Sequence, residues 1–134
     1  MASEDLAYLD ASAFLKIAVQ ESGYETLLAT LDRWVRWVSS ALLEVEAIIT
    51  ARRRHPRAAD LARALLQTVD LVEIDAGIRH AAADLADPGL RCLDAIHLAT
   101  ALSLGERCGT IFTYDDRLIT AARAHGLTVS VPRP

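Results

Sequence analysis

The sequence predicts one α/β domain of three layers, with helices on both faces of a mainly parallel sheet of about five short strands. Short apolar runs of strand length alternate along the chain with longer segments of helical periodicity, as in parallel βα units. The chain has 134 residues, 52% of them hydrophobic, which suits a single core. We therefore expect residues 1–134 to form one domain without internal repeats.

The predicted strands are short and rich in apolar residues. The first covers Leu6 to Leu9 and ends at Asp10. The others are expected at residues 35–38, 71–74, 110–113 and 127–129. In an open parallel sheet, binding sites form beyond the carboxyl ends of the strands. Polar residues that follow these runs are therefore the first candidates for a functional site.

Helices are predicted where apolar residues recur every three or four positions. Pro56 separates two of them, because the residue before a proline disfavours helical backbone. Ser39 or Ser40 is a natural N-cap for the helix that ends at Arg54. Residues 91–104 are apolar nearly all round, which predicts a central, buried helix. The other helices are expected at residues 11–19, 24–34, 57–69, 75–85 and 115–124.

Composition excludes several classes of protein. The net charge of −4 argues against binding nucleic acid by bulk electrostatics alone. No run approaches the roughly 20 apolar residues that span a bilayer, and the acidic start of the chain is unlike a secretory signal. Cys92 and Cys108 have no zinc-binding spacing with the scattered histidines, so we expect two buried, reduced thiols. These features predict a cytoplasmic protein.

Three aspartates stand at the ends of predicted elements. Asp10 follows the first strand, and Asp115 lies two residues beyond Thr113 at the end of another. Both should therefore lie at the same edge of a parallel sheet. Asp94 stands near the start of the apolar helix, where it would favour the helix dipole. Taken singly, each of the three is also explained as a helix cap.

Helical geometry distinguishes Glu46 from Glu44. At about 100° per residue, Glu44 lies about 160° from Glu46 around the helix. The side expected to face the core, which Glu46 shares, contains Leu42, Val45 and Ile49. A carboxylate on a buried face costs several kcal/mol unless it is compensated. A salt bridge to Arg53, or a bound metal ion, would compensate it.

The combination of four carboxylates favours a metal site. Two like charges ~4 Å apart repel by about 4 kcal/mol at an effective dielectric of 20. A cluster at one sheet edge therefore calls for a cation, and Mg²⁺ prefers oxygen ligands. Such an ion activates water and stabilises charge in phosphoryl displacement. The sequence thus predicts a Mg²⁺-dependent enzyme acting on phosphate esters, built on Asp10, Glu46, Asp94 and Asp115.

Four segments resemble the PIN-domain ribonucleases of the VapC toxin type. They are residues 8–16, 39–46, 90–101 and 113–118, in the family's order across nearly the whole chain. The last two, at this spacing, are specific, whereas the first alone is weak. By this resemblance, the family's metal-binding acids match Asp10, Glu46, Asp94 and Asp115. The family's last acid directly follows an aromatic residue, which favours Asp115 over Asp116.

The resemblance implies a PIN-like fold and the toxin of a type II toxin–antitoxin system. It implies an endoribonuclease that cleaves RNA phosphodiester bonds with Mg²⁺, or Mn²⁺ in its place. It further implies a homodimer and a cognate VapB-type antitoxin that blocks the site. Our mechanistic hypothesis is in-line attack by a metal-activated water. Ser12 and Thr113 would orient carboxylates, with Asp116 as a neighbouring supporting acid.

Other residues have weaker functional interpretations. An arginine cluster could contact the RNA backbone, although arginines at a helix end also suit the helix dipole. Trp34 and Trp37 are expected in the core or a dimer face, and His97 is expected only to pack. The arginine cluster consists of Arg52, Arg53, Arg54 and Arg57.

Alternative functions make different demands on the sequence. A haloacid-dehalogenase-type phosphatase needs an aspartate where Ser12 stands, and a receiver domain needs a late lysine, but Lys16 is the only lysine. The P-loop motif of NTPases is missing. The remaining alternative is a catalytically weak PIN-like module that binds RNA or protein, in which the acids are only caps and salt bridges.

Overall fold

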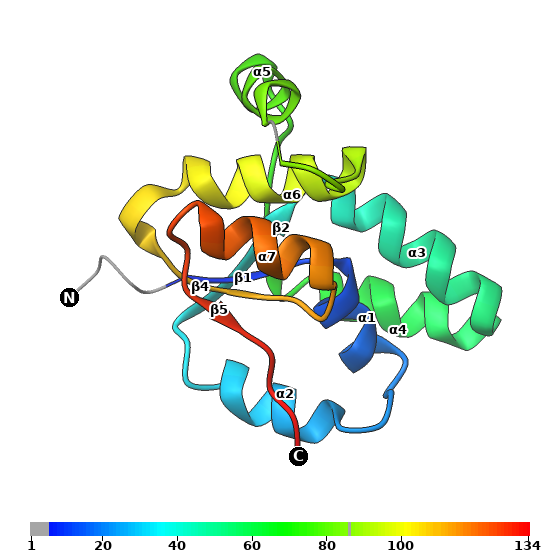
Figure 1. Ribbon diagram of the computed structural model, residues 1–134. Coiled ribbons are helices and arrows are strands. Elements are labelled where there is room, and N and C mark those ends of the chain that lie inside the picture. Colours follow the sequence, from blue (N-terminus) through cyan, green and yellow to red (C-terminus); the bar gives the residue numbers. More distant parts are fainter. Residues whose placement is uncertain (1–5, 86) are drawn as a thin grey trace.

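The computed structural model describes residues 6–85 and 87–134, which form five strands in one sheet and seven α-helices (Figure 1). The strands are β1 (Leu6–Leu9), β2 (Arg36–Ser40), β3 (Val69–Val72), β4 (Cys108–Phe112) and β5 (Val129–Ser130). The helices are α1 (Ala11–Ala18), α2 (Tyr24–Leu31), α3 (Leu42–Arg54), α4 (Pro56–Leu66), α5 (Ala76–Asp84), α6 (Cys92–Ser103) and α7 (Asp116–Ala124). The predicted three-layer α/β class is confirmed.

The sheet is parallel, with the strand order β3-β2-β1-β4-β5. The chain leaves the central strand β1 toward β3 on one side and returns to β4 and β5 on the other. Leu9 pairs with Phe112, and the Asp10 N–H donates to the Phe112 carbonyl at 3.2 Å. The residues that follow β1 and β4 therefore lie side by side. Ligands bind at such a reversal of strand order in open α/β sheets.

The central strand β1 is buried on both faces, as expected for a parallel strand between two helical layers. Leu6 and Tyr8 pack with residues of α6 and α7. Ala7 and Leu9 face the opposite way, toward α1 and α2. Helix α5 packs on the outer side of α6, away from the sheet (Figure 1).

Several element boundaries differ from the sequence-based ones. Strand β2 continues to Ser40, because Ser39 and Ser40 pair with Leu71 and Val72 of β3. The N-cap position of α3 is Ala41, not Ser39 or Ser40, so that expectation is wrong. The Ser40 hydroxyl nevertheless accepts from the Leu42 N–H at 3.1 Å, at the start of the helix. Strand β3 begins at Val69, where it pairs with β2, so the preceding helix ends earlier than expected. Helix α2 likewise ends at Leu31.

The buried side of α3 is not the one expected. Val45 and Ile49 are 56% and 41% exposed, whereas Leu43, Ala47 and Ala51 are buried. Alanines of α3 meet alanines of α4, and these small side chains let the two helices pack closely. Helical periodicity identifies residues that share a face, but the position of α4 decides which face is buried.

The cysteines differ from each other. Both are free, and Cys108 is buried as expected, but Cys92 is exposed at the start of α6, so that expectation is wrong. Helix α6 is buried only from His97 to Ala101, whereas its first residues and Ser103 at its end are exposed, so the expectation that the whole helix is buried is correct only for its middle. Within the described ranges, no helix combines the length and apolar character needed to cross a bilayer.

Candidate functional site

A pocket at the carboxyl edge of the sheet brings together the four acids expected from the sequence. Each comes from a different element of the fold. Asp10 follows β1, Glu46 lies on α3, Asp94 is in the first turn of α6, and Asp115 precedes α7. We call this the acidic pocket; its lining also includes Ser12, Arg91, Cys92, Leu93 and His97. The structure therefore places the four carboxylates around one pocket, and their catalytic and metal-binding roles stay a prediction.

Asp10 is the most tightly held of these acids. Its Oδ1 accepts from the Ala13 N–H at 2.9 Å and the Ser12 hydroxyl at 2.7 Å. Its Oδ2 accepts from the Thr113 hydroxyl at 2.5 Å. Asp10 is thus the N-cap of α1 and a member of the acidic pocket at the same time. The two interpretations of this aspartate do not exclude each other.

Ser12 and Thr113 both bind the carboxylate of Asp10 and also connect the two strand ends. The Ser12 hydroxyl donates to Asp10 and accepts from the Tyr114 N–H at 2.8 Å. The Thr113 hydroxyl donates to Asp10 and accepts from the Asp115 N–H at 3.0 Å. Each hydroxyl therefore uses both its hydrogen and a lone pair to join the end of β1 to the end of β4.

Burial sets the electrostatics of Asp10. The residue is only 4% exposed, and desolvation raises its pKa above the ordinary value. The hydrogen bonds from Thr113, Ala13 and Ser12 act in the opposite direction, because they stabilise the charged form. Desolvation is the larger effect, so these hydrogen bonds do not fully offset the cost of a buried charge on Asp10. A cation nearby would offset the remainder.

Asp94 carries the clearest sign of a missing partner. Its Oδ2 is buried and has no hydrogen-bond partner among the residues that the structure describes. Desolvation, followed by the nearby charge of Asp115, raises the pKa of Asp94. A buried carboxylate oxygen without a partner is costly in a folded protein. In a pocket lined by three further carboxylates, a cation would satisfy it.

Glu46 is held by a residue that the sequence did not single out for this role. The Nε2 atom of His97 lies 2.7 Å from Glu46 Oε1. The other ring nitrogen of His97 lies 2.8 Å from the Tyr8 hydroxyl. The expected alternative partner of Glu46, Arg53, is exposed at the other end of α3. His97 therefore does more than pack, and only its polarity inside an apolar helix hinted at this.

The donor set fits a hard divalent cation held partly through water. All four acids carry carboxylate oxygens, the type of ligand that such cations prefer, and among the described residues one oxygen of Asp94 has no hydrogen-bond partner. In the described part of the chain, however, no three His, Cys, Asp or Glu side chains lie close enough together to ligate one ion directly. Mg²⁺ typically keeps several waters and uses one or two protein carboxylates, so wider spacing suits it.

The neighbouring acids occupy other positions. Asp115 caps α7 by accepting from the Arg117 N–H at 2.9 Å and also lines the acidic pocket. Asp116 is exposed and lines a separate hollow with Asp87. The structure therefore brings Asp115, rather than Asp116, to the other three acids. Glu44 is exposed on α3, as expected.

One arginine lines the pocket, and the predicted RNA-contacting arginines do not. Arg91, which sequence patterns did not distinguish, lines the acidic pocket itself. The predicted RNA-contacting arginines lie beyond it, at the last turn of α3 and the start of α4, and all are exposed: Arg52, Arg53, Arg54 and Arg57. Arg54 is paired with Glu21 at 3.2 Å. Their contact with RNA stays a prediction.

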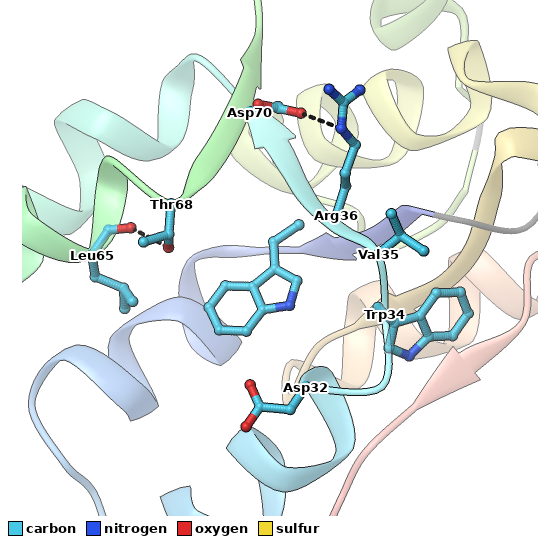
Figure 2. Close-up of a pocket in the computed structure, with 8 residues that line it drawn as sticks. Asp32, Trp34, Val35, Arg36, Leu65, Thr68 and Asp70 are labelled. Atoms are coloured by element: carbon cyan, nitrogen blue, oxygen red, sulfur yellow. Dashed lines mark hydrogen bonds and ion pairs between the residues drawn. The ribbon is translucent and has the colours of Figure 1, made fainter.

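A second hollow lies at the amino end of β2, at the opposite edge of the sheet (Figure 2). Trp34 and Trp37 line it and are both partly buried. Trp34 packs edge-on against Phe112, and the Trp37 N–H donates to the Leu31 carbonyl at 3.0 Å. Their contacts with the core agree with the expectation that these indoles pack, and they lie away from the acidic pocket.

Comparisons with known proteins agree with this geometry. Residues 7–124 match the family model of the PIN domain. Over 131 residues the chain is 40% identical to Ribonuclease VapC35 of Mycobacterium tuberculosis, covering 95% of this chain and 97% of that protein.

Two solved structures share the fold. Mycobacterium tuberculosis VapC20, described as a toxin that cleaves the sarcin-ricin loop, superposes with a TM-score of 0.74 at 18% identity and covers 96% of this chain and 99% of its own. A toxin–antitoxin complex from Klebsiella pneumoniae gives a TM-score of 0.70 at 23% identity, covering 94% and 97%. These likenesses support the architecture from β1 to β5.

Proposed function

The chain belongs to the PIN-domain family, among the ribonucleases of the VapC toxin type, and on that premise we propose that it cleaves RNA endonucleolytically with Mg²⁺ or Mn²⁺ as its cofactor. The proposal includes its role as the toxin of a VapBC pair acting in the cytoplasm. One observation supports it most directly. Four carboxylates from four elements meet in one pocket, where a buried oxygen of Asp94 lacks a partner among the described residues.

The side chains of the acidic pocket would share the work of the reaction. Asp10, Glu46, Asp94 and Asp115 would hold the cation, which would supply the Lewis acidity to activate water and stabilise charge on the phosphate. Ser12 and Thr113 keep the Asp10 carboxylate in one orientation through hydrogen bonds of 2.7 and 2.5 Å. This preorganisation lowers the cost of assembling the site when RNA arrives.

The test compares two glutamates on the same helix. Glu46→Gln and Asp94→Asn should each lower the rate of Mg²⁺-dependent RNA cleavage by at least about 100-fold, the upper range for residues that merely support a metal ligand. The matched control is Glu44→Gln, which changes an exposed carboxylate two positions away. Circular dichroism would confirm that each variant is folded. Cleavage that persists in EDTA, or full activity in both pocket variants, would refute the proposal.

A catalytically weak binding module is the second candidate. It is favoured by the lack of any three potential ligand side chains that are close together in the described residues. In that case the four acids would act only as caps and ion-pair partners. RNA binding without cleavage, unchanged by Mn²⁺ and by Asp94→Asn, would support the module over the enzyme.

The proposal extends to two protein partners. The solved toxin–antitoxin complex of the same fold supports a cognate VapB-type antitoxin that would cover the acidic pocket. A homodimer is supported by Val45 and Ile49, apolar residues one turn apart on the exposed side of α3. We also propose that RNA backbone meets arginines near the site, for which the exposed cluster at the end of α3 is available. Co-purification with the antitoxin and inhibition of cleavage would test the first partner.

A further inference from the structure

We propose that His97 is a positioning residue, which holds the Glu46 carboxylate in the acidic pocket through its Nε2–H while Tyr8 fixes the required tautomer. This inference deepens the proposed function and rests on it, because it assigns a role to Glu46 as a ligand. The three residues come from three elements: Tyr8 from β1, Glu46 from α3 and His97 from α6. They form a single chain of hydrogen bonds from the core to the pocket.

Solvent exposure increases along this series of hydrogen bonds, from Tyr8 to Glu46. Tyr8 is fully buried, His97 is 2% exposed, and the Glu46 side chain is 14% exposed. The Tyr8 hydroxyl lies 2.8 Å from His97 Nδ1, and His97 Nε2 lies 2.7 Å from Glu46 Oε1. The Tyr8 and His97 rings also meet edge to face, with centroids 5.8 Å apart. Packing therefore fixes the imidazole, and the imidazole reaches out to the carboxylate.

The partners determine where the hydrogens lie. Two acceptors would not approach to 2.7 Å without a hydrogen between them, so the proposal places a hydrogen on His97 Nε2, which donates to the Glu46 carboxylate. Burial raises the pKa of Tyr8 well above its ordinary value, so the phenol keeps its hydrogen. At 2.8 Å from Nδ1, this hydroxyl can donate to the ring nitrogen, which is the direction that the proposal requires. A hydrogen on Nδ1 alone would leave the Nε2 lone pair facing the carboxylate. Tyr8 thus selects the tautomer that can bind Glu46.

Glu46 needs such a partner more than the other acids do. Asp10 is held by three hydrogen bonds from Ala13, Ser12 and Thr113. Within the described residues, the structure gives Glu46 one hydrogen-bond partner, which is His97. A glutamate has one more rotatable bond than an aspartate and loses more entropy when it is fixed. Without His97, the Glu46 carboxylate would sample positions away from the pocket.

The first experiment measures Mn²⁺ affinity by titration calorimetry without RNA. His97→Phe keeps an aromatic ring in the core but removes the donor, and should weaken Mn²⁺ binding by about 10- to 100-fold. His97→Gln can place an amide N–H close to the position of Nε2 and should restore the affinity to within about threefold of the wild type. His125→Phe is the matched control, because it breaks a histidine–carboxylate contact of 2.9 Å with Asp87. The control should leave Mn²⁺ affinity unchanged.

The second experiment observes the His97 tautomer directly. Its only variant is Tyr8→Phe, which removes the phenol oxygen and nothing else. Nitrogen-15 NMR of the imidazole should show hydrogen on Nε2 of His97 in the wild type, with Nδ1 as an acceptor. In Tyr8→Phe the Nδ1 signal should change and Mn²⁺ affinity should fall less than in His97→Phe. These two measurements keep the inference testable if His97→Phe does not fold. A wild-type His97 with hydrogen on Nδ1 only would overturn it.

The outcomes separate this inference from the proposed function. If Asp94→Asn abolishes cleavage while His97→Phe binds Mn²⁺ as tightly as the wild type, the ribonuclease proposal stands and the role of His97 is wrong. Equal losses of Mn²⁺ affinity in His97→Phe and His97→Gln would also overturn this role, because a side-chain N–H donor at position 97 would then have no effect on binding. If wild-type protein binds no Mn²⁺, both the metal-dependent function and this role of His97 fail.

Discussion

Thr113 donates a hydrogen bond of 2.5 Å to Oδ2 of Asp10, although the two residues are 103 positions apart in the chain. They meet because β1 and β4 are neighbouring parallel strands that end at the same edge, with Leu9 paired to Phe112. The bond supports a carboxylate whose charge burial disfavours. The acidic pocket therefore depends on the pairing of the first and fourth strands.

Thr113→Val should destabilise the fold at pH 7. The substitution keeps the shape of the side chain but removes the donor to Asp10 and the acceptor for the Asp115 N–H. Hydrogen bonds to charged groups contribute about 1.5–3 kcal/mol, so we expect a loss of that size in the free energy of unfolding. Urea denaturation measures it. Thr113→Ser retains the hydroxyl and is the control, and equal losses in both variants would contradict the role of this bond.

Asp94→Asn should change how stability depends on pH. Desolvation and Asp115 raise the pKa of Asp94 in the folded state above its ordinary value of 3.8. The folded state then binds a proton more tightly than the unfolded state, so stability is lost as pH rises from about 3.8 through the folded pKa. Asparagine does not titrate, so the variant does not lose stability in this way. The stability of Asp94→Asn relative to wild type should therefore rise as the pH passes from about 3.8 through the folded pKa, and then level off.

Denaturation of the metal-free protein between pH 4 and pH 8 would measure this difference. Asp60→Asn, which changes an exposed aspartate on α4, is the control. A constant difference between Asp94→Asn and wild type at every pH would show that Asp94 does not titrate with a raised pKa.

Mn²⁺ should stabilise the wild-type protein against heat. A ligand at 100 times its dissociation constant adds about 2.7 kcal/mol to the stability of the state that binds it. Because Asp10 and Asp94 belong to the same pocket, Asp10→Asn should lose most of this gain. Thermal unfolding with and without Mn²⁺ measures the effect. The same shift in wild type and Asp10→Asn would place the bound ion elsewhere.

The two thiols should react at very different rates. Cys92 is exposed beside the acidic pocket, whereas Cys108 is buried and burial raises its pKa to about 11. Only thiolates react readily, so an aromatic disulfide reagent at pH 8 should label one thiol in the native protein and two after unfolding. Bulky labelling at Cys92 should also reduce RNA cleavage. Cys92→Ser should be resistant to this inhibition, and rapid labelling of Cys108 in native protein would contradict its burial.

Ile49→Glu should shift the proposed homodimer toward monomer. Ile49 is 41% exposed on the same side of α3 as Val45, and a charge there opposes apolar contact between two copies. Light scattering after size-exclusion chromatography measures the molar mass. Leu61→Glu places the same charge at a 54% exposed apolar residue on α4 and is the control. If Ile49→Glu leaves the mass of the wild-type species unchanged, this side of α3 is not the interface.

The sequence by itself determined the class of the fold and the four carboxylates that line the acidic pocket. Local periodicity showed the order of strands and helices to within a few residues, and parallel strands must present their ends at one edge. Asp10 and Asp115 were therefore placed together without coordinates. Glu46 was distinguished from Glu44 by angles that any α-helix imposes. The structure leaves Glu44 exposed and brings Glu46 into the pocket, although the face predicted to be buried with Glu46 is exposed at Val45 and Ile49.

The tertiary structure alone decided which sides are buried and which distant residues meet. Periodicity groups Val45 with Ile49, but the approach of α4 to the alanines of α3 leaves that group exposed. The contact of His97 with Glu46 spans 51 positions, and its contact with Tyr8 spans 89. Such contacts depend on how helices from separate parts of the chain pack on one sheet, and short-range propensities carry no information about that packing.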